Sequence, residues 1–355
     1  MQMFEFTRQE LEERCKEIQV APVHAKDLMR ETYKELAREP WLRRGLPMRL
    51  QREFADQART DSARIREERC SRYDSTVKFL VALTDDALVE SVLMPEKSRI
   101  TLCISSQVGC AQACSFCHTG RMGLKRQMTA GEIVGQVVMA NRWLKEHPEW
   151  GKAWNYPDDC RVTNIVFMGM GEPLDNVEEL KKALKILTDP YGLNIGLRRI
   201  SVSTAGHLPG IKNLLLDFPQ VSLALSLHAT TDRERSRLMP INRRWPIQEV
   251  LDYLRGHYEA LQGKRDLLIQ YTVIQGVNDT PRHAEELLQL LNGLPVKVNL
   301  IPLNDVEQIR FRAPQPESLA NFRDLLHQGG IRVMIRYSKG QDIEAACGQL
   351  AVQEA

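Results

Sequence analysis

The sequence contains neither a long apolar run nor a large excess of charge of one sign. No stretch approaches the roughly 18 consecutive apolar residues that a membrane-spanning helix needs, so we expect a protein outside the membrane. Charged residues appear within the first ten positions, too early for the apolar core of a signal peptide, which predicts a cytoplasmic protein. The formal net charge is only +2, and any surface that binds nucleic acid must therefore be local.

Internal repeats and low-complexity tracts are also missing. Of the 355 residues, 43% are hydrophobic and 26% are charged, which is the balance of a globular protein. This composition excludes a disordered chain, a collagen-like chain and a coiled coil. The length is sufficient for a large core and for two or three structural units.

The first part of the chain, residues 1–75, is expected to form a helical accessory domain. Apolar residues recur at helical spacing among many Glu and Arg residues in three segments, 7–18, 24–38 and 48–70. The stretch Trp41–Arg52 contains no acid and four arginines: Arg43, Arg44, Arg49 and Arg52. Such a run is either a solvated surface or a patch that contacts phosphates. Residues 76–96 then predict a β-hairpin that links this domain to the rest.

The core of the chain, residues 97–337, alternates apolar β-branched runs with amphipathic segments. Strands are expected at 99–105, 162–168, 199–203, 221–226, 267–274, 297–302 and 331–336. Helices are expected near 129–146, 176–187, 246–261, 281–292 and 316–328. The alternation predicts an α/β fold with a parallel sheet covered by helices. A full barrel, a partial barrel and an open doubly wound sheet all fit this pattern.

Cysteines cluster strongly after the first of these runs. Four of the eight cysteines lie within fifteen residues, and Cys110, Cys114 and Cys117 form a CxxxCxxC motif. Three thiolates so close together can hold a four-iron cluster and leave one iron open for a substrate. Structural zinc, with His118 or another cysteine as fourth ligand, is the alternative, although zinc sites normally use two separated cysteine pairs.

The chain resembles the RlmN/Cfr family of radical S-adenosylmethionine (radical SAM) RNA methyltransferases. The resemblance extends over about residues 75–351 and is weaker in the N-terminal region. It is carried by eight segments in the same order: CISSQVGCAQACSFC (103–117), MGMGEPLDN (168–176), VSTAG (202–206), LSLHA (225–229), LMPIN (238–242), GVNDT (276–280), VNLIPLN (298–304) and DIEAACGQLA (342–351). It implies a partial (β/α)6-type barrel with an N-terminal helical domain and a C-terminal segment, 338–355.

The resemblance also implies the cofactors and the residues that hold them. Cys110, Cys114 and Cys117 match the ligands of one [4Fe-4S] cluster, whose open iron binds SAM. The positions that match SAM contacts are Gly171, Glu172, Ser203, Ser226, Leu227, His228 and Asn304. Each lies near the carboxyl end of an expected strand, where barrel enzymes place their chemistry. Taken alone, each of them would more often be a structural residue.

Two further cysteines match the thiols of an unusual family reaction. The match to Cys347 is methylated by one SAM, and the 5′-deoxyadenosyl radical from a second SAM abstracts hydrogen from that methyl group. The resulting carbon radical adds to adenine, and the match to Cys103 resolves the adduct through a transient disulfide with Cys347. Glu90 matches the proposed proton acceptor. Without the resemblance, Cys103 would be a buried strand cysteine and Glu90 a polar residue on an exposed hairpin face.

The implied substrate is adenine in RNA. Relatives of the RlmN type methylate C2 of an adenosine in the peptidyl-transferase centre of 23S rRNA, and some also methylate the adenosine 3′ of the anticodon in tRNA. Val108 and Pro173 favour this type over Cfr-type methylation at C8. We also expect a monomer that receives electrons from a donor such as a flavodoxin. Candidate RNA contacts outside the Trp41–Arg52 run are Arg121, Lys125, Arg126, Arg243 and Arg244.

Two rival functions remain at the level of the sequence. A different radical SAM reaction, such as glycyl-radical activation or sulfur insertion, would use the three-cysteine motif but leave Cys103 and Cys347 unexplained. A non-catalytic RNA-binding protein with structural zinc is the other alternative. The sequence assigns no role to Cys15, Cys70 and Cys160.

Overall fold

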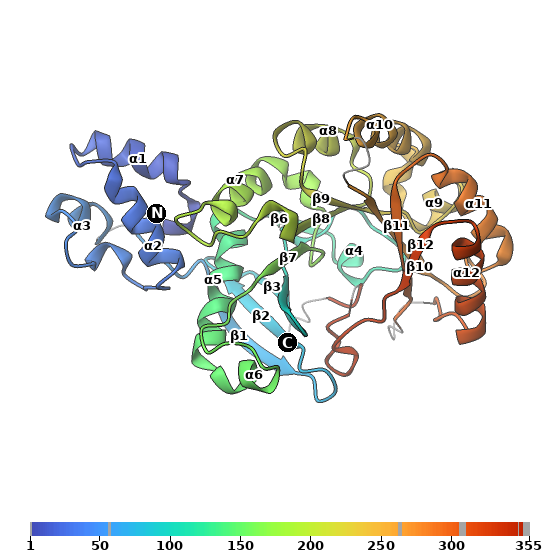
Figure 1. Cartoon of the computed structure of the whole chain (residues 1–355), viewed down its shortest axis with the longest axis horizontal. Coiled ribbons are helices and arrows are strands. Elements are labelled where there is room, and N and C mark those ends of the chain that lie inside the picture. The colour runs from blue at the N-terminus through green and yellow to red at the C-terminus, as the bar shows by residue number, and fades with distance from the viewer. Residues whose placement is uncertain (1, 56–57, 262–264, 305–309, 347, 351–355) are drawn as a thin grey trace.

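The computed structural model describes residues 2–55, 58–261, 265–304, 310–346 and 348–350. A ten-stranded sheet forms its centre, in the order β1-β2-β3-β4-β7-β8-β9-β10-β11-β12. Helices pack on the outside of the curved parallel part of the sheet, and the N-terminal helices lie at one end of the molecule (Figure 1). None of the described helices is long and apolar enough to cross a membrane.

Seven of these strands form the parallel part: β4 (Arg99–Cys103), β7 (Asn164–Phe167), β8 (Ile200–Thr204), β9 (Ser222–Ser226), β10 (Leu267–Val273), β11 (Val296–Pro302) and β12 (Arg332–Ile335). Each pairs in parallel with its neighbour in this order. Within the described residues β12 does not pair with β4, so the barrel is open. The α/β fold and the partial barrel are thereby confirmed, and all seven strands lie at the expected segments.

The connecting helices bury one face against the sheet. They are α5 (Ala130–Glu146), α6 (Pro148–Ala153), α7 (Val177–Thr188), α8 (Leu208–Asp217), α9 (Asp232–Leu238), α10 (Ile247–Ala260), α11 (Pro281–Leu291) and α12 (Pro316–Gln328). A capping box between Thr129 and Glu132 begins α5. The sequence analysis did not predict α8, whose first turn contains Pro209 and Gly210. Proline is tolerated there because the first helical N–H groups have no partner within the helix.

An antiparallel extension adjoins the barrel. β2 (Val77–Leu83) and β3 (Leu88–Glu96) form the expected hairpin, and β3 also pairs with β4, with Val92 opposite Cys103. The prediction of a helix over 48–70 is wrong in its second half, because α3 (Met48–Ala55) ends early and β1 (Ala63–Cys70) is a strand. Only Ala63 of β1 is buried. Pairing with β2 therefore overrides the helix propensity of its Arg and Glu residues.

The N-terminal region shares its core with the barrel. Its elements are η1 (Met3–Glu5), α1 (Arg8–Glu17), α2 (Val23–Tyr33), η2 (Pro40–Leu42) and α3. Met3 and Phe4 are buried where η1 packs against α5 and α7, and they belong to the same hydrophobic cluster as the barrel residues. Arg8 donates to Asp189 at 2.9 Å, which joins α1 to the end of α7. The division at residues 75, 96 and 337 stays a prediction.

The C-terminal segment returns to the antiparallel strands. The backbone N–H of Gly340 donates to Asp74 at 3.0 Å, and Lys339 donates to the carbonyl of Pro95. The short helix η6 (Gln341–Ile343) follows. Lys78 of β2 then donates to the carbonyl of Glu344 at 3.3 Å. These contacts hold the described part of the segment across the open side of the barrel.

Candidate functional site

The cysteine motif lies on a loop at the carboxyl ends of the barrel strands. The loop runs from β5 (Gln107–Gly109) to α4 (His118–Met122), and β6 (Leu124–Gln127) pairs back with β5. Gly109 has φ +80°, and a Cβ atom there would lie 1.9 Å from the carbonyl oxygen of Gly123, so only glycine allows this close approach. The N–H of Ser115 donates to Leu238 at 2.9 Å and fixes the loop to α9.

Ionisation of the thiols in the motif is unfavourable because they are buried close to one another. Burial raises the pKa of Cys110 to about 12. The pKa of Cys114 is raised well above its ordinary value, first by burial and then by the neighbouring thiols of Cys117 and Cys110. Metal binding requires thiolates, and a cluster of iron ions supplies the positive charge that stabilises them. The three residues therefore suit an iron–sulfur cluster chemically.

One cavity joins the three cysteines to most of the residues expected to contact SAM. It is lined by Cys110, Cys114, Cys117, Gly171, Glu172, Ser203, Ser226, His228 and Asn304, among others. Leu227 is not among its lining residues. Its side chain is fully buried, and its carbonyl accepts a hydrogen bond from Arg235 at 3.0 Å. No lysine or arginine of the described chain lines this cavity, which we call the upper cavity.

Glu172 is the buried carboxylate of the upper cavity. It is 3% exposed and accepts hydrogen bonds from the backbone N–H of Ala205 at 2.7 Å and of Leu174 at 3.1 Å. Burial raises the pKa of Glu172 to about 7, and the nearby charge of Asp175 acts in the same direction. A buried carboxylate with no cationic side chain in its cavity suits a ligand that carries an ammonium group.

The floor of the upper cavity is a polar layer inside the barrel. Gln270 of β10 accepts hydrogen bonds from Ser203 at 3.0 Å and Ser226 at 3.4 Å, and it donates to the sulfur of Met168 at 3.3 Å. The sequence analysis missed Gln270 and Thr272. The available signal was their spacing, since two polar residues at alternate positions of an otherwise apolar strand point to the same face.

His228 is a neutral histidine in this structure. Its Nδ1 accepts a hydrogen bond from the backbone N–H of Thr272 at 2.8 Å. Burial lowers its pKa to about 3, and the charge of Arg235 adds to that effect. The ring packs edge-on against Phe116 with centroids 4.9 Å apart, and the backbone has φ +59°.

Arg235 lies fully buried behind the cysteine loop, and the sequence analysis did not identify it. Its guanidinium donates to the carbonyls of Leu227, Ala205 and Ser226 and to Oδ1 of Asn242, at distances from 2.6 to 3.0 Å. None of these acceptors is a carboxylate. The charge of Arg235 lowers the pKa of Cys114, whereas burial raises it more strongly. A cluster held by the loop would therefore experience this fixed positive charge.

Of the residues expected to act in the methyl transfer, the structure describes Cys103 and Glu90, and neither of them lines the upper cavity. Cys103 is 6% exposed at the end of β4. Glu90 is 4% exposed on β3 and forms an ion pair with Lys78 at 3.2 Å, so it does not lie on an exposed hairpin face, and its role as proton acceptor stays a prediction. Cys347 lies outside the described residues. Its neighbour Gly348 lines the upper cavity, and the Gly348 carbonyl accepts from the N–H of His118 at 2.9 Å.

No disulfide joins any two of the seven described cysteines, which are Cys15, Cys70, Cys103, Cys110, Cys114, Cys117 and Cys160. The structure therefore does not support a permanent disulfide among these residues. The transient disulfide between Cys103 and Cys347 stays a prediction, because Cys347 is not described.

Several candidate RNA contacts have structural partners. Arg126 forms ion pairs with Asp85 at 2.7 Å and Glu132 at 2.8 Å, and hydrogen bonds to these carboxylates raise its pKa. Arg43 pairs with Asp27 at 2.6 Å and with Glu31 at 3.0 Å. Part of the basic charge expected to face RNA therefore stabilises the protein's own surface.

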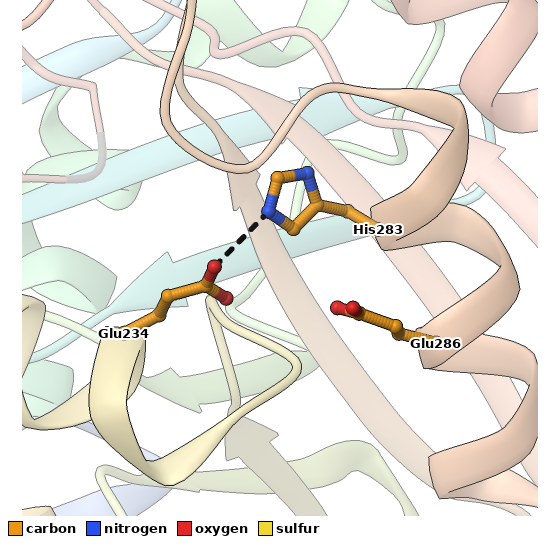
Figure 2. Close-up of side chains that lie close together, drawn as sticks. All are labelled: Glu234, His283 and Glu286. Carbon is orange, nitrogen blue, oxygen red and sulfur yellow. Dashed lines mark hydrogen bonds and ion pairs between the residues drawn. The ribbon is translucent and has the colours of Figure 1, made fainter.

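A second cluster of metal-ligand residue types lies between α9 and α11, outside the upper cavity. Nε2 of His283 lies 3.4 Å from Oε1 of Glu234, and the carboxylate of Glu286 faces both (Figure 2). Arg282 forms ion pairs with Glu234 at 3.3 Å and Glu286 at 3.6 Å. The ion pair of Arg282 with Glu234 connects α11 to α9, and the same guanidinium also pairs with Glu286 within α11.

Comparisons with known proteins agree with this geometry, although no protein-family model matches the chain. It is 44% identical over 290 residues to the probable dual-specificity RNA methyltransferase RlmN of Akkermansia muciniphila, covering 79% of this chain and 76% of the relative. It is 46% identical over 309 residues to the dual-specificity RNA methyltransferase RlmN of Anaeromyxobacter dehalogenans, covering 87% and 80%.

A solved structure extends the likeness to the whole fold. The crystal structure of a radical SAM methyltransferase from Sphaerobacter thermophilus superposes with a TM-score of 0.90 at 41% identity, covering 99% of each chain. This superposition includes the barrel, the cysteine loop and the antiparallel strands. The chain therefore belongs to the RlmN family of radical SAM RNA methyltransferases.

Proposed function

We propose that the protein methylates C2 of an adenosine in 23S rRNA, and the adenosine 3′ of the anticodon in some tRNAs, in the cytoplasm. The observation that carries this proposal is the composition of the upper cavity. Three crowded thiols and the buried carboxylate of Glu172 line it, and no cationic side chain of the described residues does. A cluster on the thiols and the ammonium group of SAM on Glu172 would supply the missing positive charge.

The residues of the upper cavity have complementary tasks in this proposal. Cys110, Cys114 and Cys117 hold one [4Fe-4S] cluster, which when bound supplies the single electron that cleaves SAM. Glu172 accepts hydrogen bonds from the SAM ammonium group. Ser203, Ser226, His228 and Asn304 offer polar groups along the cavity, and Gly171 also lines it. Apolar neighbours such as Phe116, Met239 and Leu303 keep water from a reactive radical.

Cys347 accepts the first methyl group in this proposal, and Cys103 later releases the product. The support for Cys347 is that Gly348, the next residue in the chain, lines the upper cavity. Cys103 lies at the end of β4, opposite Val92 of β3. Glu90 accepts the proton that the adenine ring loses. Its ion pair with Lys78 keeps a carboxylate near the segment that precedes Cys347, because Lys78 also donates to Glu344.

The two-stage route follows from the reactivity of adenine. The C2 carbon is not nucleophilic and cannot attack the electrophilic methyl group of SAM, whereas a carbon radical can add to it. Val108 and Pro173 are both buried close to the cysteine loop and favour C2 over C8. Arg121 and Lys125 lie on the exposed side of the same loop region, where phosphates of an unstacked RNA segment could bind. The protein acts as a monomer and receives electrons from a donor of the flavodoxin type.

Mass spectrometry of modified nucleosides tests the proposal. Reconstituted protein, SAM and a reductant are incubated without oxygen with unmodified 23S rRNA fragment or with tRNA. We expect 2-methyladenosine from wild-type protein, none from Cys347→Ala, and normal amounts from Cys160→Ala, a matched thiol outside the upper cavity. Formation of 8-methyladenosine would assign the Cfr-type reaction. Absence of methyladenosine from a protein that cleaves SAM would contradict the proposed substrate.

A further inference from the structure

A second cavity opens at the amino ends of the barrel strands, opposite the cysteine loop. Its volume is about 400 Å³, which lies within the range of about 300–1,000 Å³ typical of ligand pockets. Met168 lines both cavities, and its contact with Gln270 belongs to the layer that separates them. We call this second hollow the lower cavity.

The lower cavity is strongly basic. Arg198 and Arg199 of η4 (Leu197–Arg199) line it from exposed positions, and the half-buried Arg336, directly after β12, lines it as well. None of these three guanidinium groups has an ion pair with a carboxylate among the residues that the structure describes. The acid in the lining, Glu96, already pairs with Arg99 at 2.5 Å. Three positive charges thus converge on one hollow without compensation from the described chain.

Arg265 adds a further unbalanced donor next to this group. Its Nη2 is buried and has no hydrogen-bond partner within the described ranges. Burial lowers the pKa of Arg265, and the positive charge of Arg198 acts in the same direction. Like charges at close range are stabilised when an anion lies between them.

The interior of the lower cavity also contains neutral polar groups without partners. Asn299 of β11 is 4% exposed, and its Oδ1 is buried with no hydrogen bond to any described residue. The hydroxyl of Ser201 on β8 is also buried and has no hydrogen bond to any described residue. Val166 and Leu268 supply apolar walls beside them. The lining therefore combines sites for an anion, for hydroxyl groups and for an apolar ring face.

We propose that the lower cavity binds a small phosphorylated molecule with free hydroxyl groups, of about the size of a nucleoside diphosphate. Guanidinium groups bind phosphate oxygens in pairs, so Arg198, Arg199 and Arg336 hold the phosphates. Asn299 and Ser201 face the hydroxyl groups deeper in the barrel. The residues used here are separate from those of the methylation proposal, which can hold or fail independently.

Calorimetric titration of the reconstituted full chain tests this site. Saturating SAM is present without reductant, so that the upper cavity is occupied. ADP, pyrophosphate and adenosine are then titrated separately. We expect ADP to bind more tightly than either fragment, because only ADP uses the basic and the neutral halves of the cavity. The double substitution Arg198→Gln/Arg199→Gln should weaken ADP by about tenfold or more, since charge-assisted hydrogen bonds are lost.

A matched control removes the same charge elsewhere. The double substitution Arg66→Gln/Arg72→Gln alters two exposed arginines that do not line the lower cavity and should leave ADP affinity within about twofold. SAM affinity should be unchanged in both double variants, which also reports correct folding. The proposal is overturned if ADP fails to bind beside SAM, or if both double variants weaken ADP equally. It is also overturned if only a short oligoribonucleotide, and not ADP, depends on Arg198 and Arg199.

Discussion

Lys78 and Glu90 form an ion pair of 3.2 Å in which their side chains are only 9% and 5% exposed. The two residues lie on neighbouring antiparallel strands, β2 and β3. Lys78 also donates to the carbonyl of Glu344. One ammonium group thus connects a buried carboxylate of the sheet with the C-terminal segment.

Removing Lys78 should therefore be costly. In Lys78→Met the carboxylate of Glu90 would be buried without its cation, and we expect the free energy of unfolding to fall by about 3–5 kcal/mol. The double variant Lys78→Met/Glu90→Leu should recover most of this loss, because it leaves no buried charge. Urea denaturation of the wild type, Lys78→Met, Glu90→Leu and the double variant gives the comparison. If Lys78→Met and the double variant lose equal amounts of stability, the unpaired carboxylate of Glu90 is not the cause of the loss.

Loss of one thiol from the motif should abolish cluster binding. We expect Cys114→Ala to contain little iron after anaerobic reconstitution, because two thiolates cannot hold a four-iron cluster firmly. Cys15→Ala, a buried thiol in α1, should retain the iron content of the wild type. Iron and sulfide analysis with the visible absorption spectrum measures this. Stoichiometric zinc in place of iron in the wild-type protein would contradict the assignment.

Glu172 should make the cluster-free protein less stable as the pH rises. Burial raises its pKa from 4.5 to about 7, so the folded chain holds this proton more tightly than the unfolded chain does. The resulting stabilisation is complete below about pH 4.5 and is lost as the pH rises through about 7, a change of about 3 kcal/mol.

The variant Glu172→Gln isolates this effect. The free energy of unfolding of this variant, relative to that of the wild type, should increase by about 3 kcal/mol between pH 5 and pH 8. The titration of His228 at low pH affects both proteins equally and cancels in this comparison. Glu178→Gln, which alters an exposed carboxylate at the start of α7 outside the upper cavity, is the matched control. Thermal unfolding at several pH values supplies the data. A difference that does not change with pH would mean that Glu172 is not protonated in the folded chain.

Arg235 should influence the reduction potential of a bound cluster. A fixed positive charge near Cys114 favours the reduced form, so Arg235→Met should lower the midpoint potential by an amount on the order of 50 mV. Arg235→Lys keeps the charge and should keep the potential, although both variants lose stability because carbonyls that accepted hydrogen bonds become unsatisfied. Redox titration followed by electron paramagnetic resonance tests this. Equal potentials in all three proteins would exclude an electrostatic role.

Gly171 should not tolerate a side chain. Its φ is +104°, and a Cβ atom would lie 2.6 Å from the Cβ of Gln107 and 2.9 Å from its backbone nitrogen. Gly171→Ala should cost about 2 kcal/mol of stability and weaken SAM binding, because the clash lies beside Glu172. Gly196→Ala, where nothing lies within 4 Å of the added atom, should be close to neutral. Unfolding and SAM titration distinguish the two, and similar losses in both would contradict a local clash.

The pattern of strands and helices was readable because it depends on local periodicity. The seven parallel strands and the helices α5, α7, α10, α11 and α12 lie at the expected segments. The β1 strand was missed because its Arg and Glu residues have helical propensity, and only its pairing with β2 makes it a strand. The α8 helix was missed because Pro209 and Gly210 usually interrupt helices.

The candidate site, like the fold, could be predicted from the sequence only in part. The CxxxCxxC spacing and the ordered motifs by themselves determined the family and the three thiols that share the upper cavity. Only the tertiary structure decided that Glu90 is buried against Lys78, that Arg235 lies behind Cys114, and that Arg198, Arg199 and Arg336 surround a second cavity. Short-range spacing survives in the sequence, whereas burial and charge compensation arise from segments far apart in the chain that meet only after folding.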